Sequence, residues 1–206
     1  KDAGRNSLHF FDHSMSADAF SRAALEVDLR HAIEKEDGQL VLYFQPQVQA
    51  DGSVASVEAL LRWAHPVRGL ISPMEFIPIA ESSGLILPLG SWVLERACLH
   101  MRDWAASPHL AQVSVAVNVS AHQFRDERFV DCVGQALHRT GVPPHRLTLE
   151  LTESVLVSDI AKTVDKMLAL NQMGVRCALD DFGTGYSSLA YLKQLPIYLL
   201  KIDRTF

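Results

Sequence analysis

The stretch that decides the fold is Val113–Ser120, which reads VSVAVNVS, together with Arg146–Thr152, which reads RLTLELT. Because side chains alternate between the two faces of a strand, the valines of the first run and the leucines of the second each form one apolar face. The opposite face is small or polar, and it carries Asn118 in the first run and Glu150 in the second. This alternation predicts two strands with helices packed on one face and a polar site on the other.

Three further apolar runs carry charged side chains in the same way. Glu58 lies in Val54–Trp63, Asp180 ends Arg176–Asp180 with Asp181 next to it, and Lys201 lies in Leu199–Asp203. A charge inside an apolar strand is costly unless it is paired or binds a metal. The runs alternate with helical patterns, as in an α/β, TIM-like (β/α) barrel with its site at the C-terminal ends of the strands. We therefore expect the polar positions to converge: Glu58, Asn118, Glu150, Asp180 and Lys201.

Strands and helices are predicted along the whole chain. Six strands are expected, and the first two, 39–48 and 54–63, flank the turn signal Asp51-Gly52 and should be antiparallel neighbours. The expected helices cover residues 16–36, with Ser16 as N-cap, 73–82, 90–106, 126–140, 158–173 and 187–193. A closed barrel normally has eight strands, so we expect an incomplete barrel, either a fragment of a domain or its ordered part. Residues 1–15 are expected to form a short strand, 7–11, and a turn outside this domain.

The composition limits the function classes. The chain has 206 residues, 48% of them hydrophobic, which is enough for one domain with its own core. A formal net charge of −5 argues against binding of a nucleic-acid polymer. Cys98, Cys132 and Cys177 lie far apart in apolar settings and are expected to be reduced core residues of a cytoplasmic protein. No stretch approaches the ~20 apolar residues of a membrane span, so no membrane insertion of this segment is expected.

The most specific motif is Asp180–Leu189, which reads DDFGTGYSSL. Successive strand residues face opposite ways, so Asp180 and Asp181 reach one site only if the strand breaks between them, which Gly183 and Gly185 permit. Adjacent carboxylates repel each other unless a cation neutralises them. An Asx-turn with solvated acids is the alternative, but the polar residues at neighbouring strand ends favour a site.

The residue types indicate which metal such a site would take. Carboxylate and amide oxygens suit Mg²⁺ or Mn²⁺ rather than Zn²⁺. The nine histidines show no His-Glu-x-x-His spacing, and we expect His65 and His122 at the surface or at helix caps. No Gly-x-Ser-x-Gly elbow indicates a serine nucleophile. The residues alone therefore predict a metal-dependent α/β-barrel enzyme with an anionic substrate.

In their order and detail, the motifs resemble those of the EAL-domain family of bacterial cyclic di-GMP phosphodiesterases. The matching motifs extend from about Ala17 to Phe206: Tyr43-Phe44-Gln45-Pro46, Glu58-Ala59-Leu60-Leu61-Arg62-Trp63, His65-Pro66, Phe76-Ile77-Pro78-Ile79-Ala80-Glu81, Asn118-Val119-Ser120, Glu150-Leu151-Thr152-Glu153, Asp180 to Leu189 and Lys201-Ile202-Asp203. Lys1–Met15 resembles the last strand of a GGDEF (diguanylate cyclase) domain. The resemblance therefore implies the end of a GGDEF-like domain and a linker over 1–15, and an EAL domain over 16–206.

The resemblance implies a two-metal site that holds Mg²⁺ or Mn²⁺. One metal would be held by four of the strand-end residues: Glu58, Asn118, Glu150 and Asp180. Asp180 together with Asp181 would hold the second. Two bridged cations can activate a water and stabilise an in-line displacement at phosphorus.

The resemblance also implies roles around the metals. Lys201 would orient or polarise the attacking water, and a plain salt bridge to Asp180 is its structural alternative. Gln45 and Arg62 would contact the dinucleotide, Arg62 as a phosphate fork or, alternatively, as an ion pair at the barrel mouth. Glu153 would brace the loop after Asp181, which is linked to dimerisation in the family. Glu58, Lys201 and Glu153 are thus the residues expected to be needed for catalysis.

The sequence departs from the family pattern at Tyr198, where the family usually has Asp, and a local effect on the loop or dimer surface is expected. The family's last metal-binding glutamate and a further site glutamine lie on two strands beyond the six predicted here. The leading prediction is hydrolysis of cyclic di-GMP to linear pGpG, and the alternative is a catalytically inactive cyclic di-GMP receptor. Expected partners are cyclic di-GMP, a second copy in a homodimer, and an upstream GGDEF or sensor domain, through which the parent protein could be anchored to a membrane.

Overall fold

The computed structural model describes residues 13–156, 159–183 and 192–203, and its centre is one seven-stranded sheet. The strands are β1 (Leu40–Val48), β2 (Val54–His65), β3 (Gly69–Ile71), β4 (Ser114–Val119), β5 (Leu147–Thr152), β6 (Arg176–Phe182) and β7 (Leu199–Ile202). They lie in the order β1-β2-β4-β5-β6-β7, and β3 pairs with β2 outside this path. β1 is antiparallel to β2, as the Asp51-Gly52 turn predicts, whereas neighbours from β2 through β4, β5 and β6 to β7 are parallel.

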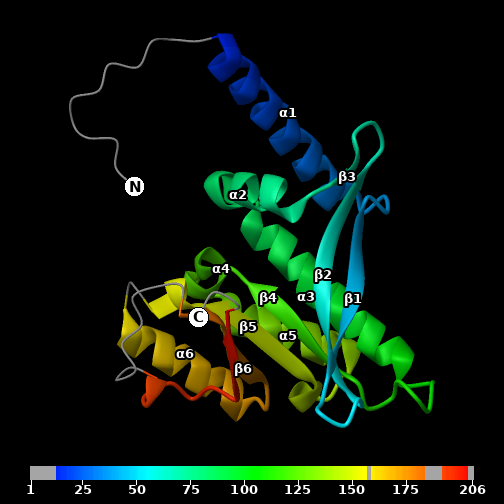
Figure 1. Ribbon diagram of the computed structural model, residues 1–206, viewed down its shortest axis with the longest axis vertical. Coiled ribbons are helices and arrows are strands. Elements are labelled where there is room, and N and C mark those ends of the chain that lie inside the picture. The colour runs from blue at the N-terminus through cyan, green and yellow to red at the C-terminus, as the bar shows by residue number, and fades with distance from the viewer. Residues whose placement is uncertain (1–12, 157–158, 184–191, 204–206) are drawn as a thin grey trace.

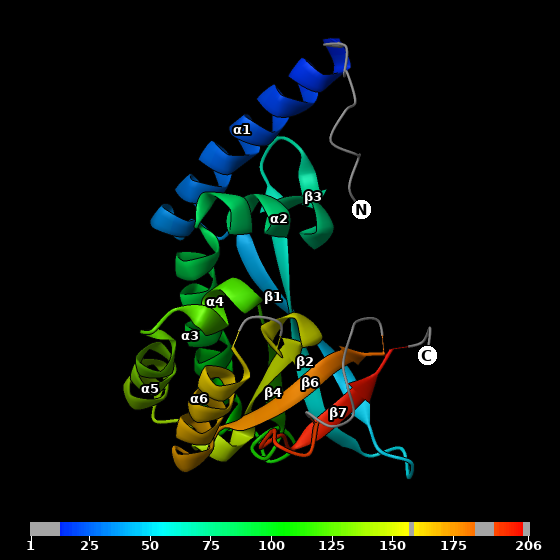
Figure 2. The ribbon, with the colours of Figure 1, turned by 90° about the vertical axis from the view of Figure 1, so that its left-hand side faces the viewer.

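Within the described residues, six helices lie around this sheet. They are α1 (His13–Lys35), α2 (Pro73–Ser83), α3 (Ile86–Trp104), α4 (Ala121–Arg125), α5 (Phe129–Thr140) and α6 (Ile160–Gln172), with short 3₁₀ segments at Pro144–Arg146 and Glu153–Leu156. Figures 1 and 2 show α3, α5 and α6 along one face of the sheet, and α1 and α2 at the end of the molecule reached by the long β1–β2 hairpin. The strand and helix alternation predicted from the sequence is therefore confirmed.

The other face of the sheet is concave. The Gln47 side chain on β1 donates to Glu150 Oε1 on β5 at 3.2 Å, although β2 and β4 lie between these strands. Three strand spacings of a flat sheet would separate them by roughly 14 Å. The sheet therefore curls into a partial barrel, and within the described residues β1 and β7 are its two unpaired edges. This confirms the predicted TIM-like, incomplete barrel with an antiparallel first strand.

The hydrophobic side chains form two cores. The larger lies between the sheet and α3, α5 and α6, and it includes the alternating residues predicted to face the helices: Val115, Val117, Val119, Leu147, Leu149 and Leu151. These side chains are at most 3% exposed, and burial of each contributes about 1.5–3 kcal/mol. The smaller core joins α1 and α2 to the ends of β1 and β2 through residues such as Leu25, Leu29, Trp63 and Phe76.

Some predicted boundaries were wrong for identifiable reasons. α1 begins at His13, three residues before the predicted cap Ser16, and no glycine or proline between them interrupts the helix. The third strand, β3, is only three residues long, too short for an alternation pattern. The short helix α4 was also missed, although Ser120 and Gln123 form a capping box at its start. The strand expected at 7–11 and most of the helix expected at 187–193 lie outside the described residues.

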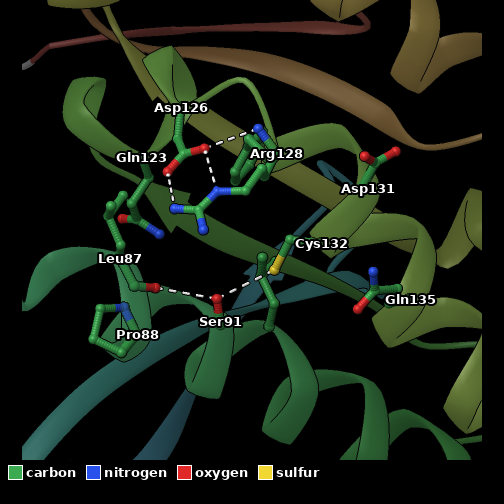
Figure 3. A pocket seen from close by; sticks show the side chains of 11 residues that line it. Leu87, Pro88, Ser91, Gln123, Asp126, Arg128, Asp131, Cys132 and Gln135 are labelled. Atoms are coloured by element: carbon green, nitrogen blue, oxygen red, sulfur yellow. Dashed lines mark hydrogen bonds and ion pairs between the residues drawn. The ribbon is translucent and has the colours of Figure 1, made fainter.

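α3 begins at Ile86, four residues before the predicted start at Gly90. The glycine is not a terminus but a contact point, because a Cβ at this position would meet Gln123 Nε2 at 1.6 Å. Gln123 is itself 6% exposed, and its Oε1 accepts from the Ser120 amide at 3.1 Å. Figure 3 shows the Gln123 side chain extending from α4 towards the first turns of α3. Gly90 therefore lets α4, and with it the end of β4, pack directly on α3.

We expect Gly90→Ala to destabilise the protein, although glycine to alanine inside a helix normally stabilises by about 1 kcal/mol. The added methyl overlaps the Gln123 amide, and such overpacking costs about 1–3 kcal/mol. Gly134→Ala in α5 is the matched control, because its Cβ would meet the flexible end of Met173 at 3.1 Å. Chemical unfolding should show a loss for Gly90→Ala but not for Gly134→Ala. Gly90→Ala should also become harmless in a Gln123→Ala background, and equal effects in both backgrounds would contradict the contact.

The three cysteines differ in their surroundings. Cys98 and Cys177 are buried, and burial raises the pKa of Cys98 to about 11 and that of Cys177 to about 12. Cys132 is only half-buried, so the prediction of a core residue was wrong for it. It lines a cavity of about 540 Å³ between α3 and α5, where its Sγ lies 3.2 Å from Ser91 Oγ (Figure 3). Cys132 is therefore the thiol that solvent reaches.

In a thiol titration of the native protein near pH 8, we expect Cys132 to react first and Cys98 and Cys177 to react only on unfolding. A thiol is nucleophilic as its thiolate, and burial keeps both core thiols protonated. Cys132→Ser should remove the fast phase, while Cys98→Ser should leave it in place. A fast phase that survives in Cys132→Ser would contradict the assignment.

Candidate functional site

The centre of the candidate site is the ammonium group of Lys201 on β7. Its Nζ lies 2.7 Å from Asp180 Oδ2 on β6 and 2.8 Å from Glu150 Oε2 on β5. A third carboxylate oxygen, Glu58 Oε2 on β2, lies 3.5 Å away. The three acidic residues come from three different strands and surround one positive charge, on the concave face of the sheet.

Asn118 at the end of β4 joins the same cluster. Its amide nitrogen donates to Glu58 Oε1 at 2.7 Å. The structure therefore brings together all five polar positions that the strand pattern singled out: Glu58, Asn118, Glu150, Asp180 and Lys201. They meet because parallel strands place their carboxyl ends at one edge of a sheet.

The electrostatics of the cluster follow from its burial. The Glu150 side chain is 0% exposed, and burial raises the pKa of this carboxyl although Lys201 stabilises its charged form. Burial alone would lower the pKa of Lys201, but its hydrogen bonds to Asp180 and Glu150 outweigh this effect and raise it well above the usual range. Counted formally, the three carboxylates of Glu58, Glu150 and Asp180 and the one ammonium of Lys201 leave an excess of two negative charges. The cluster can therefore accept further positive charge.

β6 continues to Phe182, but its backbone is irregular at Asp181. Asp181 has φ +54°, in the left-handed region that non-glycine residues seldom adopt, and the β6–β7 register shifts between Leu179 and Phe182. The Asp181 amide donates to Asp180 Oδ1 at 2.9 Å. Burial, followed by the charges of Asp180 and Asp203, raises the pKa of Asp181. Gly183 follows with φ +103°, whereas Gly185 lies outside the described residues.

Glu153 contacts Gly183, the residue that follows β6. It is 7% exposed, and its Oε1 accepts from the Gly183 amide at 2.9 Å, while its Oε2 is buried and has no hydrogen-bond partner among the described residues. The predicted role of Glu153, to brace the loop after Asp181, stays a prediction. Residues 184–191 of that loop lie outside the described part of the chain.

Gln45 and Arg62 lie on the same face of the β1–β2 hairpin as Glu58. Gln45 is directly opposite Glu58 in the antiparallel pairing, and its side chain is exposed. Arg62 donates to the Leu61 carbonyl at 2.8 Å, and its guanidinium lies 5.6 Å from the centre of the Tyr43 ring. Arg62 also lines a cavity of about 240 Å³ between β2, α2 and α3. Its described contacts are thus with a carbonyl and a ring rather than with a carboxylate.

Two residues of the site were missed by sequence reasoning. Gln47 contacts Glu150, and the Ser56 hydroxyl donates to Gln47 Oε1 at 2.5 Å. Strand alternation places Gln47 on the face of Gln45 and opposite Ser56, but it does not indicate the contact with Glu150.

None of the histidines whose side chains the structure describes takes part in the cluster. His65 was expected at the surface or a cap, but it is 9% exposed and joins β2 to α1 through Asp28 Oδ2 at 3.2 Å. His122 is exposed, 3.9 Å from Glu81. Among residues 13–156, 159–183 and 192–203, no three His, Cys, Asp or Glu side chains are grouped as metal ligands. The same residues contain no helix with the length and apolarity of a membrane span.

Tyr198 lies far from the cluster, at the start of β7. It is 63% exposed, and the Arg176 guanidinium at the start of β6 lies 4.4 Å from the centre of its ring. The Tyr198 amide donates to the Cys177 carbonyl at 2.7 Å. Because the candidate site is at the other ends of these strands, the departure at Tyr198 leaves the cluster intact.

Comparison with known proteins places this arrangement in a family. The family model described as "EAL domain" matches residues 26–206. The bifunctional diguanylate cyclase/cyclic di-GMP phosphodiesterase MucR of Pseudomonas aeruginosa is 50% identical over 207 residues, which are 100% of this chain and 30% of MucR. The cyclic di-GMP phosphodiesterase NbdA of the same organism is 42% identical over 100% of this chain and 26% of NbdA. The chain thus spans less than a third of the length of either relative.

A solved structure shows the same fold. The PaMucR phosphodiesterase in complex with c-di-GMP superposes with a TM-score of 0.83 at 50% identity, over 88% of this chain and 73% of that chain. Together with the family match over most of the sequence and the converging strand-end residues, this shows that the chain belongs to the EAL domain family.

Proposed function

We propose that the chain is a phosphodiesterase domain that hydrolyses cyclic di-GMP to linear pGpG with Mg²⁺ or Mn²⁺. Water would add to one phosphorus, and the bond from that phosphorus to a ribose 3′ oxygen would break, which leaves a dinucleotide with a 5′ phosphate. The observation that carries the proposal is the convergence of Glu58, Glu150 and Asp180 around Lys201. The named activities of MucR and NbdA, relatives that match over the full length of the chain, support it.

The donor set fits divalent metals. Three carboxylates already converge on one cation, the Lys201 ammonium, and they retain excess negative charge. Their oxygens, with the amide oxygen that Asn118 can present by turning its side chain, are ligands that Mg²⁺ and Mn²⁺ prefer. Glu58, Asn118, Glu150 and Asp180 would hold one ion, and Asp180 with Asp181 a second. Bound there, the ions would lower the pKa of a water and neutralise charge on the phosphoryl group.

Lys201 would act as a donor and not as a base. Its raised pKa keeps the ammonium protonated at neutral pH, so it has no lone pair to take a proton. It can orient a water by donating to the oxygen, and it can offset the negative charge that develops at phosphorus. Its short contacts with Asp180 and Glu150 hold the ammonium in place for this role.

The substrate would lie over the β1–β2 hairpin. Gln45 is exposed beside Glu58, and Arg62 offers a guanidinium that can form two parallel hydrogen bonds to a phosphate. The cavity beside Arg62 also has Asn118 in its wall, so it adjoins the cluster and can take an apolar part of the ligand. Glu153 would support the loop after Asp181, and we propose a homodimer through that loop. We also propose that the parent protein carries an upstream GGDEF or sensor domain, acts in the cytoplasm, and can be membrane-anchored through upstream segments.

With Mg²⁺ or Mn²⁺, we expect the full-length protein to convert cyclic di-GMP to pGpG, measured by chromatography. Glu58→Gln should lower the rate by more than about 100-fold, because even outer partners of a metal typically contribute 10–100-fold. Glu34→Gln, an exposed site on α1, is the matched control and should retain full activity. Tight binding of cyclic di-GMP without pGpG formation in either metal would favour the inactive receptor instead.

We expect Lys201→Met to destabilise the metal-free protein. Loss of one partner from a buried ion pair costs about 3–5 kcal/mol. The Lys201 side chain is 25% exposed, so we expect a smaller loss of about 1–3 kcal/mol. Mg²⁺ should restore more stability to this variant than to the unmodified protein, because a bound cation replaces the missing charge.

Thermal unfolding with and without Mg²⁺ measures both effects on stability. Lys162→Met is the control, because its side chain is 82% exposed. A Mg²⁺ response of Lys201→Met no larger than that of the control would contradict the role of Lys201 at the centre of the site.

A further inference from the structure

Beneath the carboxylate cluster, two polar side chains face the interior of the partial barrel. Gln47 on β1 and Ser56 on β2 are direct partners in the antiparallel pairing. The Ser56 hydroxyl donates to Gln47 Oε1 at 2.5 Å, and Gln47 Nε2 donates to Glu150 Oε1 at 3.2 Å. These bonds form a chain that crosses the concave face from the hairpin to β5.

The direction of each hydrogen bond in this chain is fixed by chemistry. An ionised carboxylate only accepts hydrogen bonds, so Glu150 requires the NH₂ group of the Gln47 amide. The amide oxygen must then face Ser56, whose hydroxyl donates to it. Glu150 thus sets the orientation of the Gln47 amide, and the Ser56 hydroxyl, which can donate or accept, stabilises it by donating to Oε1.

Glu150 is the cluster member that most needs such a partner. Its side chain is 0% exposed, so water cannot satisfy either oxygen. Lys201 contacts Oε2 at 2.8 Å and Gln47 contacts Oε1 at 3.2 Å, which together fix the plane of the carboxylate. Without Gln47, a buried charged oxygen would lose its donor, and the group would turn or shift to find another.

The location of the pair also indicates a purpose. The interior of a (β/α) barrel is normally filled by layers of branched apolar side chains. Gln47 and Ser56 are partly buried and lie two residues from Gln45 and Glu58 along their strands, on the same face, so this layer is polar where apolar packing would cost less. Gln45, by contrast, is exposed and available to a ligand.

We propose that Gln47, oriented by Ser56, is a positioning residue that holds Glu150 in the geometry needed to bind a divalent cation. The proposal rests on the proposed function in so far as Glu150 is a metal ligand. Gln47 touches neither substrate nor metal and acts through Glu150 Oε1, which leaves Oε2 facing the cluster.

The test measures Mn²⁺ binding to the metal-free full-length protein by electron paramagnetic resonance, without substrate. Gln47→Leu should weaken Mn²⁺ binding by about 10–100-fold, the usual range for a partner that orients a metal ligand. Gln49→Leu, the same change at an exposed position of the same hairpin, should bind Mn²⁺ as the unmodified protein does. Mn²⁺ binding by Gln47→Leu within twofold of this control would overturn the proposal.

Two further comparisons separate positioning from general damage to the fold. Ser56→Ala should weaken Mn²⁺ binding, and Ser56→Thr, which keeps the hydroxyl, should restore it. In a Glu150→Gln background, Gln47→Leu should change Mn²⁺ affinity by less than about twofold, because residues that act as a unit are not additive. Equal losses in both backgrounds, or no difference between Ser56→Ala and Ser56→Thr, would overturn the proposal.

Steady-state kinetics with cyclic di-GMP distinguishes this proposal from the proposed function. At saturating Mn²⁺, Gln47→Leu should lower kcat and leave KM within about threefold, since the substrate contacts on Gln45 and Arg62 are unchanged. If the unmodified protein forms no pGpG but Gln47→Leu still weakens Mn²⁺ binding, the activity fails and the positioning role stands. If pGpG forms normally and Gln47→Leu binds Mn²⁺ as Gln49→Leu does, the positioning role fails alone.

Discussion

One ammonium group shared by three carboxylates is the interaction on which the rest of the structure depends. Glu58, Glu150 and Asp180 are close enough to repel each other strongly in a partly dehydrated site, and the Lys201 ammonium makes their proximity tolerable. Because each group comes from a different strand, the same contacts join β2, β5, β6 and β7 at their carboxyl ends. The same ion pairs therefore stabilise both the site and the sheet. A substitution that removes one of these charges should change the stability of the sheet as well as the geometry of the site.

The curvature of the sheet makes this arrangement possible. The helices α3, α5 and α6 cover one face with a large apolar core, so polar side chains are confined to the concave face. The antiparallel β1 then supplies a polar row, Gln45 and Gln47, next to β2. A parallel strand would need a long crossover to reach this position, whereas a tight turn brings β1 beside Glu58 directly.

The sequence allowed the elements of the barrel and the converging residues to be predicted, because alternation within strands is a strong local signal. Asn118 and Glu150 stand out for this reason, because each is the larger polar side chain on the small or polar face of its strand. The signal fails where a residue acts across the sheet. Nothing next to Gln47 in the sequence indicates that it reaches Glu150, three strands away, since that contact exists only after the sheet curls. Gly90 was wrongly predicted as a helix start for a related reason. The side chain that requires a glycine there, Gln123, comes from another helix.

The two cores of the molecule are not independent. Leu61 and Trp92 pack against both, so they form the seam between the lobe of α1 and α2 and the barrel. Leu61 lies on β2 between Glu58 and Arg62, the acid of the cluster and the arginine of the adjoining cavity. In terms of cooperative folding units, partial opening of the lobe would remove packing from β2 at this point first. The packing of α1 and α2 is therefore linked, through Leu61, to the strand that carries Glu58.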